Sequence, residues 1–252
     1  MTTFVLIHGA WHGAWCWEKV TPLLEDQGHR VIAPDLPGMG EDRAPLAEVT
    51  LEGWARFVAD TVTAQGEPVI LIGHSRAGIV ISEAAELVPD RIRVLVYLAA
   101  FLVPNGATLL QTMRRVPPRP ESEGSLVFSP DAAISTIAPD AVERVFYNTT
   151  PAPLVARAAR LVGPEPMMSF TTPLRVTEER FGLVPRIYIE CAKDRAIAPT
   201  LQAMMVEETP CREVIRMESD HSPFYSAAVE LADHLSGIAS RADAETVRTA
   251  QG

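Results

Sequence analysis

Three side chains far apart in the sequence are of the types that perform nucleophilic catalysis when they meet: Ser75, Asp194 and His221. A serine hydroxyl is a poor nucleophile until a neighbouring imidazole takes its proton. The imidazole needs a carboxylate on its other ring nitrogen, which fixes the tautomer and stabilises the cation that forms. Because the unperturbed pKa of histidine is about 6.5, the ring can act first as base and then as acid near neutral pH. These residue types predict acyl transfer through a covalent intermediate on Ser75.

Ser75 lies in a turn of small residues, Gly73-His-Ser-Arg-Ala-Gly78, directly after an apolar run. A sharp strand-to-helix turn with the pattern G-x-S-x-G exposes the serine at the end of a sheet and aims the next backbone N–H at a developing oxyanion. Here the last glycine of the pattern is replaced by Ala77, which adds one methyl group where helix and strand pack closely. We predict that Ser75 is the nucleophile; the alternative is a serine in an ordinary glycine-rich turn.

Several aspartates other than Asp194 could be the carboxylate that pairs with the histidine. Asp35 lies in the turn sequence Asp-Leu-Pro-Gly, where aspartate and glycine serve turn geometry. Asp220 adjoins His221 and is too close along the chain for a natural hydrogen bond to its ring, and Asp42 is the remaining rival. Asp194 follows a separate apolar run, so we predict it as the acid. For His221 the alternative is a histidine in a surface loop.

The elements that must position these residues form an alternating pattern of strands and helices. Apolar runs without two-residue alternation are typical of parallel strands covered on both faces. Six such runs are Phe4–Ile7, Val31–Ala33, Val69–Ile72, Val94–Ala99, Ile187–Glu190 and Val214–Met217. Stretches with helical spacing lie between several of them, at Trp17–Glu25, Leu51–Ala64 and Ile79–Leu87. The pattern predicts an α/β fold with a mostly parallel six-stranded sheet flanked by helices.

About 80 residues after the fourth run break this rhythm, are rich in proline and contain no strong strand signal. A connection of that length is usually an inserted functional element. We predict a largely helical lid over residues 104–181, with short helices at Pro139–Tyr147 and Pro151–Leu161. Residues 1–103 and 182–240 would form the core, and residues 241–252 a polar C-terminal tail that frays.

The composition of the chain restricts its possible binding partners and its cellular compartment. A net charge of −10 argues against binding nucleic acid through a broad basic face. No apolar run approaches the roughly 18 residues of a membrane span, and the N-terminus resembles no signal peptide. The three cysteines are odd in number and lack a C-x-x-C pair, which argues against a disulfide frame or a zinc site. We therefore predict a cytoplasmic protein that binds neither membrane nor nucleic acid. Its oligomeric state stays open, with a homodimer as one option.

Several segments across nearly the whole chain share one family pattern. They are Phe4–Trp15, Pro22–Glu25, Gly28–Val31, Thr177–Gly182, Tyr188–Cys191, Lys193–Ile197 and Asp220-His221. In these segments, and in the chain order serine, acid, histidine, the sequence resembles the α/β-hydrolase superfamily. Within it, the sequence is similar to the branch of plant methylesterases and hydroxynitrile lyases and their bacterial serine esterase relatives. The resemblance implies a triad of Ser75, Asp194 and His221, an oxyanion hole from the backbone N–H groups of Ala10 and Arg76, and no metal or cofactor.

Other side chains near these segments are candidates for substrate contact. We predict that Trp11, His12, Met168 and Phe170 border the substrate, although packing in the core is an equal alternative for the last two. The Arg76 guanidinium could point at an anionic substrate, but we favour its pairing with a carboxylate of the lid.

The predicted function is that of a serine carboxylic-ester hydrolase acting on a small, fairly apolar ester, such as a methyl ester or lactone. A cyanohydrin lyase on the same scaffold is one alternative. The lyases of this branch carry a lysine directly after the triad histidine, and Ser222 occupies that position here. A ligand-binding homologue with little turnover is a second alternative, which the fold alone does not exclude.

Overall fold

A computed structural model describes the backbone of residues 1–250 and the side chains of residues 1–244. Its centre is a six-stranded sheet with the order β2-β1-β3-β4-β8-β9, in which all neighbours run parallel. The predicted fold class and the six predicted strands are confirmed. The strands are β1 (Thr3–Ile7), β2 (Arg30–Ile32), β3 (Val69–His74), β4 (Ile92–Leu98), β8 (Arg186–Cys191) and β9 (Glu213–Met217).

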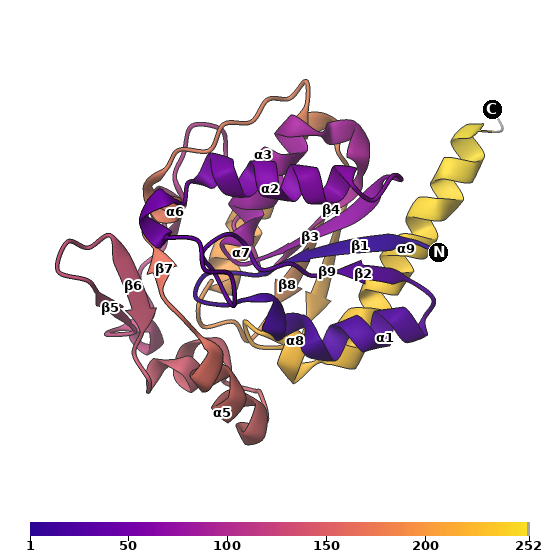
Figure 1. The fold of residues 1–252 in the computed structure, drawn as a ribbon. Helices are drawn as coiled ribbons and strands as arrows, with labels where there is room; N and C mark the ends of the chain where they lie inside the picture. Colours follow the sequence, from indigo (N-terminus) through magenta and orange to yellow (C-terminus); the bar gives the residue numbers. More distant parts are fainter. Residues whose placement is uncertain (251–252) are drawn as a thin grey trace.

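The central strands are apolar because both faces of the sheet are covered. Every residue of β3 is buried, and Leu71 pairs with Val5 on one side and Leu95 on the other. On one face α2 (Leu51–Thr63) packs against α3 (Ala77–Leu87), and on the other α1 (Val20–Asp26) packs against α9 (Ala228–Ala250) (Figure 1). Since the strands are parallel, their carboxyl ends meet at one edge, and the loops that follow them are brought together there.

Shorter helices complete the core. The predicted helix Trp17–Glu25 is in fact two elements, the 3₁₀ helix η1 (Ala14–Lys19) followed by α1. Pro22 explains the break, because it lacks an N–H and is tolerated only in the first turn of an α-helix. The remaining core helices are η2 (Leu46–Glu48), η3 (Pro89–Arg91), η6 (Phe181–Leu183), α7 (Pro199–Glu208) and α8 (Pro223–Ser226).

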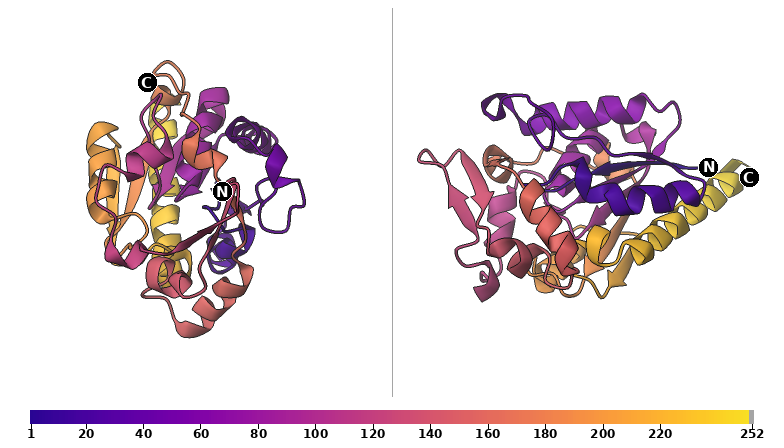
Figure 2. Two further views of the ribbon diagram at one scale, coloured as in Figure 1. Left: turned by 90° about the vertical axis from the view of Figure 1, so that its left-hand side faces the viewer. Right: turned by 60° about the horizontal axis from the view of Figure 1, so that its bottom comes forward.

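Most of residues 104–181, the segment predicted as a lid and called the lid below, lie beyond the carboxyl edge of the sheet, at the end of the molecule away from the N-terminus (Figure 2). Its last residues run back along α3, where Thr177 and Arg180 hydrogen-bond to Glu86. Beside its helices, this segment contains a three-stranded antiparallel sheet in the order β5-β6-β7, which was not predicted from the sequence. Its strands have two to four residues, too few to give a periodic signal. The lid elements are α4 (Leu109–Met113), η4 (Pro120–Ser122), β5 (Leu126–Phe128), β6 (Ile134–Ile137), η5 (Val142–Phe146), α5 (Ala152–Leu161), β7 (Glu165–Pro166) and α6 (Met168–Thr171).

Two lid helices were expected from the sequence, and they differ in outcome. The helix expected at Pro151–Leu161 is present as α5. The one expected at Pro139–Tyr147 is a single π-helical turn, η5. Single π turns are uncommon and often occur at functional sites.

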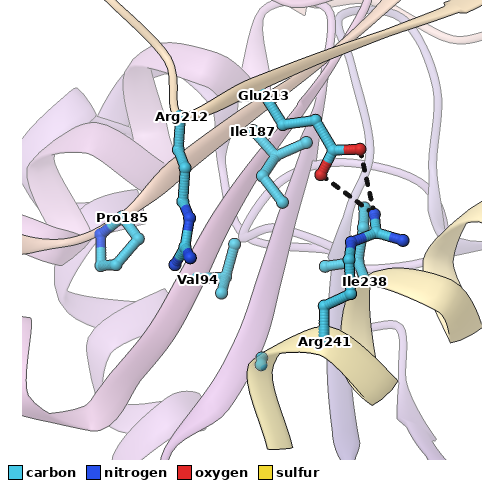
Figure 3. A pocket seen from close by; sticks show the side chains of 8 residues that line it. Val94, Pro185, Ile187, Arg212, Glu213, Ile238 and Arg241 are labelled. Carbon is cyan, nitrogen blue, oxygen red and sulfur yellow. Dashed lines mark hydrogen bonds and ion pairs between the residues drawn. The ribbon is translucent and has the colours of Figure 1, made fainter. Parts of the chain in front are cut away.

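Residues 241–250, in the segment predicted as a C-terminal tail, continue the helix α9 to Ala250; residues 251–252 lie outside the described part. Buried Leu235, Ile238 and Ala242 hold the helix against the sheet. Arg241 forms an ion pair with Glu213 beside a small cavity between α9 and the strands (Figure 3). This cavity lies near the starts of β4, β8 and β9, at the edge of the sheet opposite Ser75.

Candidate active site

Ser75 stands between the end of β3 and the start of α3, with a backbone φ of +55°. It is 7% exposed. An added Cβ at Gly73 would lie 2.9 Å from the Ala77 carbonyl oxygen, and one at Gly78 only 2.2 Å from the Phe101 carbonyl oxygen. Glycine is therefore required at positions 73 and 78, whereas position 77 accommodates the alanine methyl group. The incomplete G-x-S-x-G pattern still builds a tight elbow, because the glycine needed for the close approach is Gly78.

His221 and Asp194 meet at the carboxyl edge, on the loops that follow β9 and β8. The His221 Nδ1–H donates to Asp194 Oδ2 over 2.7 Å, and both side chains are buried. The other carboxylate oxygen, Oδ1, accepts the backbone N–H groups of Ala196 and Ile197 at 2.7 and 2.8 Å. The carboxylate is thus fixed from two sides, and it holds the imidazole in the tautomer whose Nε2 is free to accept a proton.

Gln202 on α7 is a neighbour of this pair that the sequence reasoning missed. Its Nε2 donates to Asp194 Oδ2 at 3.1 Å and to the Ile197 carbonyl at 2.8 Å, and its Oε1 accepts the Cys191 N–H. Gln202 is completely buried beside Leu201. The only signal in the sequence is an uncharged polar residue on the inward face of a helix, which is too common to indicate a site.

The rival carboxylates all have structural partners. Asp220 accepts four hydrogen bonds, from the Thr149 N–H, the Thr150 hydroxyl, the Ser222 N–H and the Ser226 hydroxyl. Asp35 accepts the N–H groups of Ala14 and Glu41, and Asp42 those of Gly38 and Ala44. The turn role expected for Asp35 is thereby confirmed. Of these four aspartates, Asp194 is the one that hydrogen-bonds to the His221 ring.

His74 connects the elbow to the histidine loop. Its Nε2–H donates to the His221 backbone carbonyl at 2.8 Å, and the two rings lie 4.6 Å apart. Burial lowers the pKa of His74 well below its usual value, so the ring is neutral. His74 is completely buried next to the elbow.

The loop after β1 approaches the elbow closely at Gly9. A Cβ there would lie 2.9 Å from the Ser75 Cβ and 2.9 Å from His74 Nδ1, so the approach requires glycine. Within the described loops, neither the Ala10 N–H nor the Arg76 N–H donates to a backbone carbonyl. The Trp11 N–H, in contrast, is occupied by Glu165 Oε2 at 3.2 Å. The N–H groups of Ala10 and Arg76, the two predicted oxyanion donors, are therefore available to a substrate oxygen, whereas the Trp11 N–H is not.

The expected pairing of the Arg76 side chain with a lid carboxylate is confirmed. Its Nε donates to Glu165 Oε1 at 2.9 Å, and both side chains are buried. Glu165 belongs to β7, and nothing in the sequence distinguished it from the other lid carboxylates. The Arg76 side chain is therefore engaged within the protein.

His12 also has partners on both ring nitrogens. Its Nδ1–H donates to the Ala10 carbonyl at 2.7 Å, and its Nε2 accepts the Tyr147 hydroxyl at 2.6 Å. Burial lowers the pKa of His12 to about 4, so the ring is neutral at pH 7. The contacts of His12 thus hold the loop that carries Ala10.

Aromatic rings from the lid enclose the catalytic edge. Phe146, at the end of the π-helical turn, lies 5.6 Å from the His221 ring and 5.7 Å from the Trp11 ring, and Phe170 lies 5.8 Å from Trp11. We call Trp11, Phe146 and Phe170 the aromatic wall. Met168 instead lines a depression against residues of α2 and α3. The structure thus packs Phe170 against Trp11, and Trp11 against the Phe146 ring that contacts His221, whereas Met168 lies elsewhere.

None of the helices in the described residues has the length and apolarity to cross a membrane. In the same part of the chain, no three His, Cys, Asp or Glu side chains converge as metal ligands would.

The chain matches the model of the alpha/beta hydrolase family over residues 4–234. Methyl jasmonate esterase 1 from Vitis vinifera is 33% identical to it, over 93% of this chain and 95% of that protein. Polyneuridine aldehyde esterase superposes with a TM-score of 0.85 at 26% identity, covering 95% of this chain and 99% of that one. A pyrethroid hydrolase from Sphingobium faniae JZ-2 has a TM-score of 0.83 at 31% identity, covering 96% and 98%. On its own motifs, geometry and these matches, the chain belongs to the alpha/beta hydrolase family.

Proposed function

We propose that the protein is a serine carboxylic-ester hydrolase that cleaves methyl esters of small, largely apolar acids. The observation that carries the proposal is the buried 2.7 Å contact between His221 Nδ1 and Asp194 Oδ2 at the same sheet edge as the Ser75 elbow. Ester hydrolysis is also the activity named for its relatives, which include Methylesterase 2 from Arabidopsis thaliana at 33% identity.

In the proposed first half-reaction, Ser75 Oγ attacks the ester carbonyl carbon while His221 Nε2 takes the hydroxyl proton. The carbonyl oxygen becomes an oxyanion held by the N–H groups of Ala10 and Arg76. Asp194 stabilises the imidazolium through Nδ1. When the intermediate collapses, the carbon–oxygen bond to the alcohol breaks, and the alkoxide leaves with the proton from Nε2.

In the second half-reaction, water replaces the alcohol. His221 Nε2 takes a proton from the water as its oxygen attacks the acyl carbon. The same two N–H groups hold the second oxyanion. Collapse breaks the bond to Ser75 Oγ, which regains its proton from His221, and the carboxylic acid is released.

The enclosure of the site supports a small substrate with an apolar acyl group. Phe146 of the aromatic wall packs against the His221 ring, and Ser75 and His221 are 7% and 1% exposed. A methyl group is the smallest alcohol portion that an ester can carry, and the named methylesterases among the relatives favour it. Ser222, the residue after His221, is neutral and buried, so it provides no cation for a leaving cyanide.

The test compares the wild type with Ser75→Ala on methyl, ethyl and benzyl esters of one aryl acid and on a lactone. We expect Ser75→Ala to lose at least about 10⁴-fold in kcat and to keep the far-ultraviolet circular dichroism spectrum of the wild type. Rapid mixing of the wild type with a nitrophenyl ester should give a burst of nitrophenol, because an acyl-enzyme accumulates. Undiminished turnover by Ser75→Ala would remove Ser75 from the mechanism. A preference for benzyl over methyl esters would remove the methyl-ester assignment.

A further inference from the structure

The contact between Arg76 and Glu165 is unusual for its burial. Their side chains are 1% and 0% exposed, a degree of burial shared, among the described ion pairs, only by the pair of His221 and Asp194. Arg76 lies in the elbow of the core and Glu165 in β7 of the lid. The pair therefore joins the two parts of the molecule directly beside the nucleophile.

The hydrogen bonds of this pair bracket Ala10 from both sides. Arg76 Nη2 donates to the carbonyl of Gly9, the residue before Ala10, at 3.2 Å. Glu165 Oε2 accepts the N–H of Trp11, the residue after Ala10, at 3.2 Å. Arg76 itself carries the second proposed oxyanion donor on its backbone. One ion pair thus connects both segments whose N–H groups would hold the oxyanion.

Stability alone does not account for this arrangement. Removing a guanidinium and a carboxylate from water costs free energy, and a buried pair is often no more stabilising than apolar residues of similar size. The remaining contacts fix the orientation of the two groups. The Arg76 guanidinium lies 4.1 Å from the centre of the Trp54 ring, and Glu165 Oε1 accepts the Ser169 hydroxyl at 3.0 Å. Both partners are held in one geometry and have little freedom to adapt.

We propose that Arg76 and Glu165 are positioning residues that hold the N–H groups of Ala10 and Arg76 in the register needed to bind the oxyanion. This inference rests on the proposed ester hydrolysis by Ser75. Donors aimed at the oxyanion act in the transition state and hardly at all in the ground state. Loss of the pair should therefore lower kcat and leave KM almost unchanged.

The test uses two variants of the full chain. Glu165→Gln keeps an acceptor for the Trp11 N–H but leaves the buried guanidinium without a counter-charge, and this variant can lose stability. Arg76→Met combined with Glu165→Gln removes both charges, keeps that acceptor and fills the space of the guanidinium. The double variant should fold normally while the link between the elbow and the Gly9 carbonyl is broken.

We expect the double variant to lose roughly 10- to 100-fold in kcat with little change in KM. An arylboronic acid, which forms a tetrahedral adduct with a nucleophilic serine, should lose affinity by the same factor. The affinity for the product acid, which lacks the tetrahedral geometry, should stay near that of the wild type. If the pair has a purely structural role, the double variant should bind the boronic acid and the product acid more weakly by the same factor, and the positioning role is then wrong.

Arg157→Gln is the matched control. Arg157 on α5 makes a two-point contact with Glu18 of η1, at 2.6 Å for both hydrogen bonds, and so joins lid and core away from the oxyanion loop. This variant should keep wild-type kcat and boronate affinity. If the double variant also keeps both while Ser75→Ala is inactive, the positioning role is wrong and the proposed function stands. If Ser75→Ala retains turnover, the proposed function itself fails.

Discussion

The loops after β8 and β9 each contain a completely buried aspartate, and the two aspartates have different tasks. Asp194, after β8, contacts two backbone N–H groups, one amide and the His221 ring. Asp220, after β9, contacts two donors in the lid connection between η5 and α5, one donor in its own loop and one in α8. Both carboxylates are therefore fully hydrogen-bonded.

The difference lies in the chemistry of the partners. Every partner of Asp220 is a permanent donor, either an amide or a hydroxyl, so this carboxylate anchors the lid to the loop that carries His221. One partner of Asp194 is an imidazole, which gains a charge when it takes a proton. Residue type and burial are the same at both positions. The partner that can change its protonation state is what distinguishes the carboxylate proposed to act in catalysis, Asp194, from the structural one, Asp220.

The comparison is tested most severely by Asp194→Asn. We expect kcat to fall by about 10⁴-fold, because an amide neither fixes the productive tautomer of His221 nor stabilises its cation. Turnover of a nitrophenyl ester measures the effect, and thermal unfolding followed by circular dichroism shows whether the fold is retained. A loss below about tenfold in a folded variant would mean that the carboxylate is not part of the mechanism.

Asp220→Asn should have the opposite profile. The substitution replaces one acceptor oxygen with an NH₂ group, which would face the N–H and O–H donors that surround it. The free energy of unfolding should therefore fall by roughly 2–4 kcal/mol. The kcat of the folded protein should stay within about tenfold of the wild type, because no proton moves through Asp220. Urea titration and steady-state kinetics below the unfolding midpoint separate the two effects. A large loss of kcat at unchanged stability would invert the assignment of the two aspartates.

Gln202→Met should produce the smallest change and would define how far the catalytic network extends. The variant removes one donor from Asp194 Oδ2 and leaves the Cys191 N–H without its acceptor. We expect a loss of about 1–2 kcal/mol in unfolding free energy and a several-fold decrease in kcat. Gln27→Met is the control, because Gln27 makes an exposed side-chain contact with Asp233. Equal kinetics in the two variants would show that Gln202 supports only the fold.

The core was predictable from the sequence because its central strands are buried and form apolar runs in the sequence. The edge at which Ser75, Asp194 and His221 are brought together follows from the parallel direction of those strands. Asp194 could be preferred to Asp35 and Asp220 by chain position alone. The order of strands and helices in the sequence is therefore enough to predict that these three residues lie at the same end of the sheet.

The lid was harder to predict, for physical reasons. The strands β5, β6 and β7 have three, four and two residues, so side-chain alternation has no room to show. The pairing of Arg76 with some lid carboxylate was foreseeable, because a buried guanidinium needs a counter-charge. Its identity as Glu165 depends on how the lid folds back over the elbow, which no local pattern records. Gln202 was missed because an uncharged polar residue on the inward face of a helix is too common to indicate its contact with Asp194, eight residues earlier.

The backbone at the carboxyl edge of the sheet has a consequence for the evolution of the protein. Four non-glycine residues among those described have positive φ, and three of them, Trp11, Ser75 and Ala99, follow β1, β3 and β4. Such conformations each cost on the order of 1–3 kcal/mol, whereas a domain has a net stability of about 5–15 kcal/mol. The stability of the well-packed sheet therefore offsets unfavourable backbone conformations in the loops that include the proposed nucleophile. Substitutions that weaken the apolar core far from Ser75 reduce the same net stability that keeps Ser75, the proposed nucleophile, at positive φ.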